Sequence, residues 1–162
     1  MEIFIKEEDF KARMWLDINF FPKKRKCIPN LEWTQEQFAW NDADFTGSNQ
    51  QHYFLELKTR HNKWSDFDAL TMIEADKFNK LMEHKGEVAL LILYQDCIAY
   101  FPPSQLFDAF HSIALKYNCK DQQHPNQPNM EWKRVPKAVA LFDVNKAIKF
   151  SYDDYGGKPD FI

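Results

Sequence analysis

Carboxylates and a lysine stand in this chain at a spacing that suits a divalent cation. Asp42 and Asp44 precede the turn-forming letters GSNQ, and Glu56 and Lys58 belong to the apolar run that follows. Strand side chains alternate between faces, so Glu56 and Lys58 share one face and their apolar neighbours point to a core. If the GSNQ stretch turns the chain back, an aspartate lies beside Glu56. Two carboxylates and one ammonium there predict a site for a divalent cation and an activated water.

Glu56-Leu57-Lys58 is one of four triplets with the pattern acidic-x-Lys, and its sequence context is the most informative of the four. The same acidic-x-Lys pattern also begins at Asp9, Glu83 and Glu131, where a charged surface explains it more simply. Only the triplet at Glu56 follows an aromatic and aliphatic strand, has an acidic pair upstream and continues into the run ELKTR. With these features the chain resembles the PD-(D/E)xK nuclease superfamily, in its small stand-alone form found in phages and mobile elements. The literal Pro-Asp of that family is replaced here by Asn41-Asp42.

The resemblance implies a fold, a reaction and a set of site residues. The fold would be an α/β restriction-endonuclease-like core, with a mixed central β-sheet flanked by helices. The reaction would be hydrolysis of phosphodiester bonds, with DNA as the expected substrate and Mg²⁺ or Mn²⁺ as cofactor. Lys58 would position the attacking water, and Lys77, on the helix after the catalytic strand, would lean toward the active site. The implied catalytic residues are Asp42, Asp44, Glu56, Lys58 and Lys77, and the implied metal ligands are Asp42, Asp44, Glu56 and the backbone carbonyl of Leu57.

The sequence leaves open which aspartate is the metal ligand. Asp42 and Asp44 are two residues apart and share a strand face. A turn centred near Ser48 and Asn49 brings Asp42 closer to register with Glu56. In the resembled superfamily a large apolar residue often follows the ligand directly, which favours Asp44. Both aspartates therefore stay candidates.

Net charge restricts how such a protein would hold DNA. The chain has 21 Lys and Arg against 24 Asp and Glu, a net charge of −3, which argues against an unspecific nucleic-acid coat. Binding would instead depend on the metal and a local basic patch. The candidate nucleic-acid-binding residues are Arg60, Lys63 and the basic run Lys23, Lys24, Arg25 and Lys26. The alternative interpretation is a catalytically inactive nucleic-acid- or protein-binding module on the same fold, and a homodimer is also open.

Apolar periodicity predicts the elements around the motif. The continuous run Glu87–Leu93 predicts a central strand buried on both faces, with Ile98–Phe101 as its hairpin partner. Gly86 predicts the C-terminal end of the preceding helix. The other expectations are an amphipathic helix within Lys6–Phe20, a helical stretch marked by Ile73, Phe78, Leu81 and Met82, a helix capped by Ser104 over Leu106–Leu115, a last strand over Lys137–Phe142, and a loose C-terminal tail over residues 151–162.

Length and composition indicate a single nuclease-like domain. The chain has 162 residues, enough for one core, which we expect over about residues 30–150. Cys27, Cys97 and Cys119 are odd in number and scattered, which favours reduced thiols over a zinc site. No apolar run approaches about 18 residues, and the acidic N-terminus is unlike a signal peptide. We therefore expect a soluble, cytoplasmic protein with no membrane partner.

Overall fold

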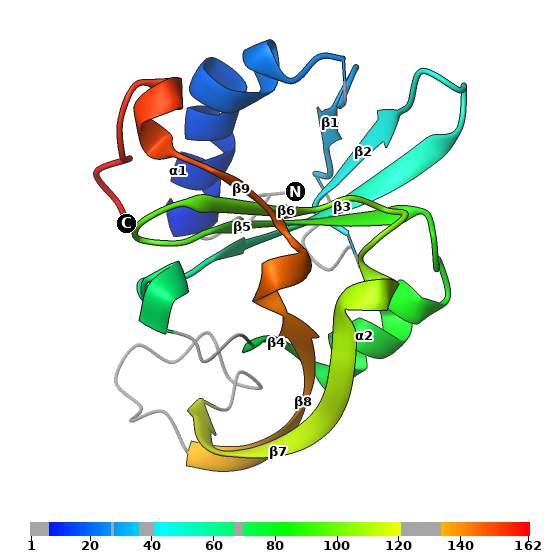
Figure 1. Cartoon of the computed structure of the whole chain (residues 1–162), viewed down its shortest axis with the longest axis vertical. Helices are drawn as coiled ribbons and strands as arrows, with labels where there is room; N and C mark the ends of the chain where they lie inside the picture. Colours follow the sequence, from blue (N-terminus) through cyan, green and yellow to red (C-terminus); the bar gives the residue numbers. More distant parts are fainter. Residues whose placement is uncertain (1–6, 27, 36–40, 67–69, 121–133) are drawn as a thin grey trace.

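The computed structural model describes residues 7–26, 28–35, 41–66, 70–120 and 134–162 (Figure 1). Its helices and strands are, in order, α1 Glu7–Trp15, β1 Glu32–Trp33, β2 Ala43–Thr46, β3 His52–Thr59, β4 Leu70–Glu74, α2 Ala75–Met82, β5 Val88–Leu93, β6 Ile98–Phe101, β7 Phe110–Lys120, β8 Arg134–Asp143 and β9 Ile148–Phe150. A π-helical turn, Leu16–Phe20, extends α1, as expected for an N-terminal helix within Lys6–Phe20. None of the helices in the described ranges is long and apolar enough to span a membrane.

Two β-sheets form the framework of the molecule. The larger sheet has six strands in the order β1-β2-β3-β5-β6-β9, and the smaller has three in the order β4-β8-β7. In the larger sheet β3 and β5 are parallel while the other neighbours are antiparallel, so this sheet is mixed. The predicted α/β class with a mixed central sheet is therefore confirmed, as are the strands expected over Glu87–Leu93, Ile98–Phe101 and Lys137–Phe142.

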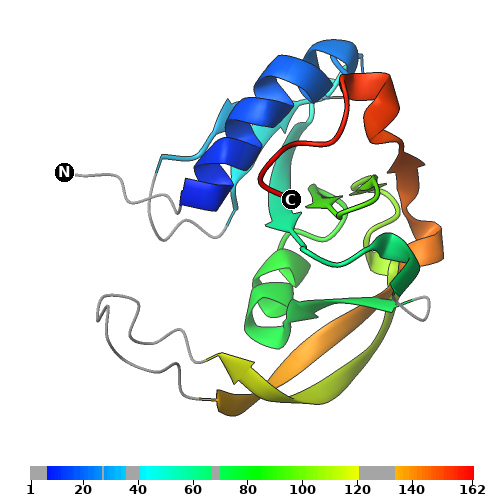
Figure 2. The same ribbon diagram turned by 90° about the vertical axis from the view of Figure 1, so that its left-hand side faces the viewer.

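Strand β5 lies between two hydrophobic cores and is buried along its whole length, as predicted. Its odd-numbered side chains join a core that includes Leu16 and Phe20, next to α1. Its even-numbered side chains join a second core that includes Phe78 and Leu81 of α2. Figures 1 and 2 accordingly place α1 on one side of the larger sheet and α2 with the smaller sheet on the other. The same alternation in β3 directs its even-numbered side chains toward α2.

Strand β7 replaces the helix that apolar spacing predicted over Leu106–Leu115. Only Phe107–Ala109 is helical there, as one 3-10 turn. From Phe110 onward the chain forms an antiparallel ladder with β8. The Phe110 ring stacks on Phe78 with 4.8 Å between centroids, which anchors the start of the strand in the second core. Helical spacing of apolar residues is ambiguous over so short a run, and the distant partner β8 decides in favour of a strand.

Strand β4 also occupies residues that were expected to be helical. Ile73 lies in β4, and α2 begins only at Ala75. The five residues of β4 pair with β8, for example Ile73 with Ala140. The predicted helix is therefore shorter than expected, because its first apolar residue belongs to the small sheet.

The C-terminal segment packs against the first core, so the prediction of a loose tail is wrong. Tyr152 and Tyr155 are buried, and the Tyr155 ring lies 5.0 Å from that of Phe20. The Tyr152 hydroxyl donates a hydrogen bond to the carbonyl oxygen of Tyr94, at 2.5 Å. Burial of two aromatic rings outweighs the flexibility that the pair Gly156-Gly157 suggested.

Candidate active site

The β2–β3 hairpin places Asp42 beside Glu56. Ala43 pairs with Leu55 in the antiparallel register. Directly beyond this pair, the Asp42 amide donates to the Leu55 carbonyl at 2.9 Å. The Leu57 amide in turn donates to Asp42 Oδ2 at 2.8 Å. The Asp42 carboxylate is therefore fixed against the backbone of β3, next to Glu56.

Asp44 lies farther along β2 and has different partners. Its Oδ1 is 3.1 Å from Nε2 of His52 and accepts a hydrogen bond from Nδ2 of Asn41, also at 3.1 Å. Asp44 does not line the cavity at Glu56, whereas Asp42 does. The geometry thus separates the two aspartates that the sequence left as equal candidates.

Glu56 is a buried carboxylate held between two ammonium groups. Only 1% of its surface is exposed. Its Oε1 is 3.0 Å from Nζ of Lys58, and its Oε2 is 2.9 Å from Nζ of Lys77. Burial raises the pKa of Glu56 above its ordinary value and the charge of Asp42 raises it further, while the two lysines oppose both effects. Both lysines that the sequence nominated therefore reach this carboxylate.

Lys58 and Lys77 reach Glu56 from different elements. Lys58 is two residues farther along β3, on the same face of the strand. Lys77 comes from the first turn of α2, which Phe78 and Leu81 anchor in the second core. The side chains of Lys58 and Lys77 are 29% and 24% exposed, so they are much less buried than Glu56.

A cavity of about 470 Å³ opens next to Glu56. Its walls are formed by β3, the end of β4, the start of α2 and the first turn of α1. Of the residues that the sequence nominated, it contains Asp42, Glu56, Lys58, Arg60 and Lys77, together with Leu57. The candidate active site is therefore a solvent-connected cavity with both carboxylates and cations in its lining.

Arg60 belongs to this cavity, but Lys63 does not. The Arg60 guanidinium donates from Nη2 to the carbonyl oxygen of Met72 in β4, at 3.2 Å. Burial lowers the pKa of Arg60, and the neighbouring carboxylates of Glu74 and Glu56 partly offset this effect. Lys63, which was expected to continue a basic track, is exposed in the loop after β3.

Three further carboxylates in the cavity wall were missed at the level of sequence. Glu8 and Asp9 come from the first turn of α1, and Glu74 ends β4. Glu8 Oε1 lies 2.6 Å from Nε2 of His61, and Glu74 Oε1 lies 3.3 Å from Nζ of Lys137. No local pattern links these residues to the β2–β3 hairpin, because the packing of α1 and of the small sheet brings them there. Asp9 also begins one of the acidic-x-Lys triplets that were interpreted from the sequence as charged surface positions.

The donor atoms near Glu56 fit a hard divalent cation such as Mg²⁺. Asp42 and Glu56 supply carboxylate oxygens, and the Leu57 carbonyl points to the same edge of β3 as the Leu57 amide, which binds Asp42. Two ammonium groups already balance Glu56 in this structure, so a divalent cation would have to compete with them for this carboxylate. Within the described ranges no three carboxylate, imidazole or thiolate groups lie close enough to hold an ion by themselves. A cation would therefore bind through two carboxylates, one carbonyl and water.

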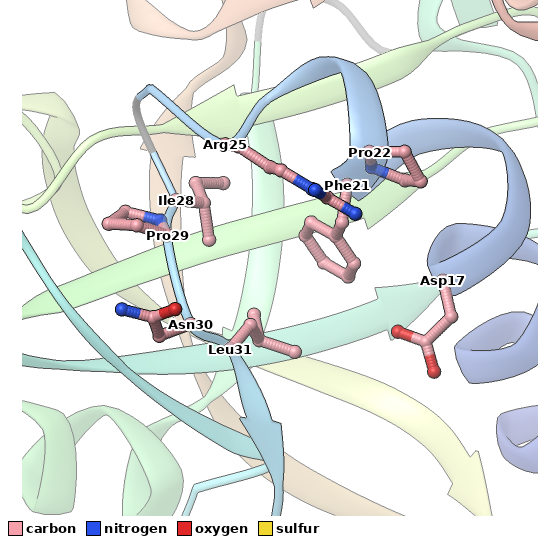
Figure 3. Close-up of a pocket in the computed structure, with 8 residues that line it drawn as sticks. All are labelled: Asp17, Phe21, Pro22, Arg25, Ile28, Pro29, Asn30 and Leu31. Carbon is pink, nitrogen blue, oxygen red and sulfur yellow. The ribbon is translucent and has the colours of Figure 1, made fainter.

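The basic run Lys23–Lys26 contributes Arg25 to a different pocket, shown in Figure 3. Arg25 lines this pocket of about 330 Å³, which shares no lining residue with the cavity at Glu56. The ammonium groups of Lys23 and Lys24 lie 5.4 and 5.5 Å from the ring centroid of Tyr155. These two lysines thus contact the packed C-terminal segment, and the run is not part of the candidate active site.

Three separate stretches of chain build the site: the first turn of α1, the β2–β3 hairpin and the β4–α2 unit. The nominated catalytic residues meet there, with the exception of Asp44. Comparison of the chain with protein-family models, curated protein sequences and solved structures finds no significant match, so its function has to be inferred from this geometry.

Proposed function

We propose that the protein is a Mg²⁺-dependent nuclease with a restriction-endonuclease-like core, which hydrolyses phosphodiester bonds in DNA. The observation that carries this proposal is the buried carboxylate of Glu56, which lies beside Asp42 and between the ammonium groups of Lys58 and Lys77. Burying a charged carboxylate costs stability unless it is well paired. Such a group in a solvent-connected cavity, with a pKa shifted by burial and by a specific neighbour, is typical of an active site.

The cavity residues would have different roles in hydrolysis. Asp42, Glu56 and the Leu57 carbonyl would hold the metal ion. When bound, Mg²⁺ supplies a polarised phosphoryl oxygen and a water of lowered pKa. Lys58 positions that water and stabilises the negative charge that develops on the phosphate. Arg60, held in the cavity wall by the backbone of β4, binds a flanking phosphate.

The cations of the cavity are groups that could bind the phosphates of a polyanionic substrate. Lys58, Arg60 and Lys77 bring three cations into a cavity that is also lined by five carboxylates, those of Glu8, Asp9, Asp42, Glu56 and Glu74. Phosphodiester oxygens are the groups that such a local cluster binds well, because each contact is charge-assisted. A non-catalytic binding module would need the cations but not the adjacent pair Asp42 and Glu56. The presence of both sets together supports a nuclease.

Cleavage assays test the proposal directly. Plasmid, linear duplex and single-stranded DNA, with RNA alongside, are incubated with the protein in Mg²⁺, in Mn²⁺ and in EDTA. We expect cleavage of DNA that requires a divalent cation and stops in EDTA. DNA binding without cleavage under every condition would instead identify the catalytically inactive module.

A lysine substitution with a matched control ties cleavage to this cavity. Lys58→Ala should lower the cleavage rate by on the order of 100-fold, the usual effect of removing one group that stabilises developing charge. Lys80→Ala serves as the control, because Lys80 is an exposed residue of α2 whose partner is Glu83 at 3.8 Å. Equal rates for the two variants would place the chemistry elsewhere.

A further inference from the structure

Lys77 occupies a position that the helix itself does not favour. It is the third residue of α2, within the first turn. The N-terminus of a helix carries partial positive charge, so a lysine there is less favourable than an acidic residue. Phe78 and Leu81 fix α2 in the second core and so determine where the Lys77 side chain starts. What Lys77 gains at this position is its contact with Glu56.

The two ammonium groups at Glu56 differ in how they are supplied. Lys58 follows from the local geometry of β3, on which Glu56 itself lies. Lys77 is brought to Glu56 by the packing of α2 in the second core, and its Nζ lies 2.9 Å from Glu56 Oε2. The Lys77 side chain is 24% exposed and lines the cavity.

We propose that Lys77 is an internal counter-ion, which occupies the cation position at Glu56 in the metal-free protein and is displaced by the divalent ion. This inference rests on the proposed function, since it concerns the same site. It explains how a carboxylate that is 1% exposed is tolerated before metal arrives. Once displaced, the Lys77 ammonium stays in the cavity, where it faces a phosphate of the substrate.

Competition between the Lys77 ammonium and the metal ion predicts the direction in which metal affinity changes when Lys77 is substituted. If Lys77 competes for Glu56, removing its charge should strengthen metal binding. A unit positive charge about 4 Å away repels a divalent ion strongly at the effective dielectric constant of a protein surface, so at least about tenfold tighter binding is expected when that charge is removed. The metal-free variant should also be less stable, because Glu56 then has one counter-ion instead of two.

Metal binding is measured directly, without an activity assay. Mn²⁺ is titrated by electron paramagnetic resonance into the wild type, Lys77→Met and Lys77→Gln, all in the same buffer at about pH 8, above the ordinary pKa of a carboxyl group. The glutamine variant keeps a hydrogen-bond donor for Glu56 and so protects the fold if the methionine variant does not fold. Lys80→Gln is the control, because it removes a charge from the same helix outside the cavity.

The outcomes separate this inference from the proposed function. Tighter Mn²⁺ binding by the Lys77 variants, with Lys80→Gln at the wild-type value, supports the inference. A larger rise of Tm on addition of Mn²⁺ in the Lys77 variants than in the wild type also supports the inference. Unchanged or weaker binding by the Lys77 variants, where the wild type binds Mn²⁺, overturns the inference alone. No Mn²⁺ binding by any variant, the wild type included, overturns the proposed function with it.

Discussion

The two ends of the β2–β3 hairpin combine acidic and basic groups in opposite settings. At one end Glu56 is 1% exposed and contacts the ammonium groups of Lys58 and Lys77. Near the turn, the side chains of Asp44 and His52 form a pair that is 38% and 60% exposed. An exposed pair contributes roughly 0–1 kcal/mol, because water screens both charges. Acidic residues on the same hairpin therefore differ in what they can do chemically.

Neighbouring elements account for the difference between the two ends. Strand β5 pairs with β3 from Phe54 to Thr59 but does not extend to His52. Helix α2 covers the even-numbered face of β3 near Glu56 and supplies Lys77. The Asp44 carboxylate instead contacts His52 and Asn41, and its side chain is 38% exposed. Burial of one carboxylate, and not its position in a motif, separates a candidate active site from a surface ion pair.

The largest expected effect is a difference in DNA cleavage between substitutions at the two ends of the β2–β3 hairpin. Glu56→Gln should reduce DNA cleavage by about three orders of magnitude, because a metal contributes several kcal/mol to stabilising the transition state. Asp44→Asn should leave the rate within about twofold of the wild type, because Asp44 does not line the cavity and a surface substitution changes stability little. Rates are measured under single-turnover conditions with Mg²⁺. A loss of activity in Asp44→Asn as large as in Glu56→Gln would mean that the exposed end also takes part in catalysis.

Metal affinity compares the two aspartates directly. Asp42→Asn should weaken Mn²⁺ binding by at least about tenfold, since its carboxylate lies on the backbone next to Glu56. Asp44→Asn should bind Mn²⁺ as the wild type does, because Asp44 does not line the cavity. Isothermal titration calorimetry gives both constants, and circular dichroism checks that each variant is folded. The reverse ranking would assign the ligand role to Asp44.

The dependence of stability on pH tests the burial of Glu56. Its pKa in the folded protein is raised above the ordinary value of 4.5, mainly by burial and then by Asp42. In the metal-free protein, its contribution to the free energy of unfolding is therefore fully present below about pH 4.5 and is lost as the pH rises through the folded pKa. Urea unfolding of the wild type and Glu56→Gln over a pH series shows this loss as a difference between the two curves. Parallel curves would mean that Glu56 is not buried as described.

The smallest expected effect compares Arg60 in the cavity with Arg25 in the other pocket. Arg60→Gln should reduce the slope of log K against log salt for duplex DNA by about 0.9, the contribution of one phosphate contact. Arg25→Gln should leave the slope unchanged, because Arg25 lies outside the cavity. Fluorescence anisotropy with a cleavage-deficient Glu56→Gln background gives the slopes. An effect confined to Arg25 would move the DNA path to the basic run.

The sequence by itself determined the local geometry of the site. Alternation along β3 placed Glu56 and Lys58 on one face, and the structure agrees. The turn letters predicted a hairpin centred near Ser48 and Asn49, and the observed pairing of Thr46 with His52 is centred at Asn49. The apolar run of β5 predicted a strand buried on both faces. These features depend on residues close together in the chain, whose spacing fixes their relative positions.

Only the tertiary structure decided which groups surround Glu56. The start of α2, and with it the reach of Lys77, depends on the pairing of β4 with β8, which apolar spacing did not indicate. The first turn of α1 brings Glu8 and Asp9 to the cavity from a distant part of the sequence. The strand β7, expected to be helical, depends on the same partner β8. Such contacts join segments that are far apart in sequence, so they depend on the packing of both cores and leave no periodic signal.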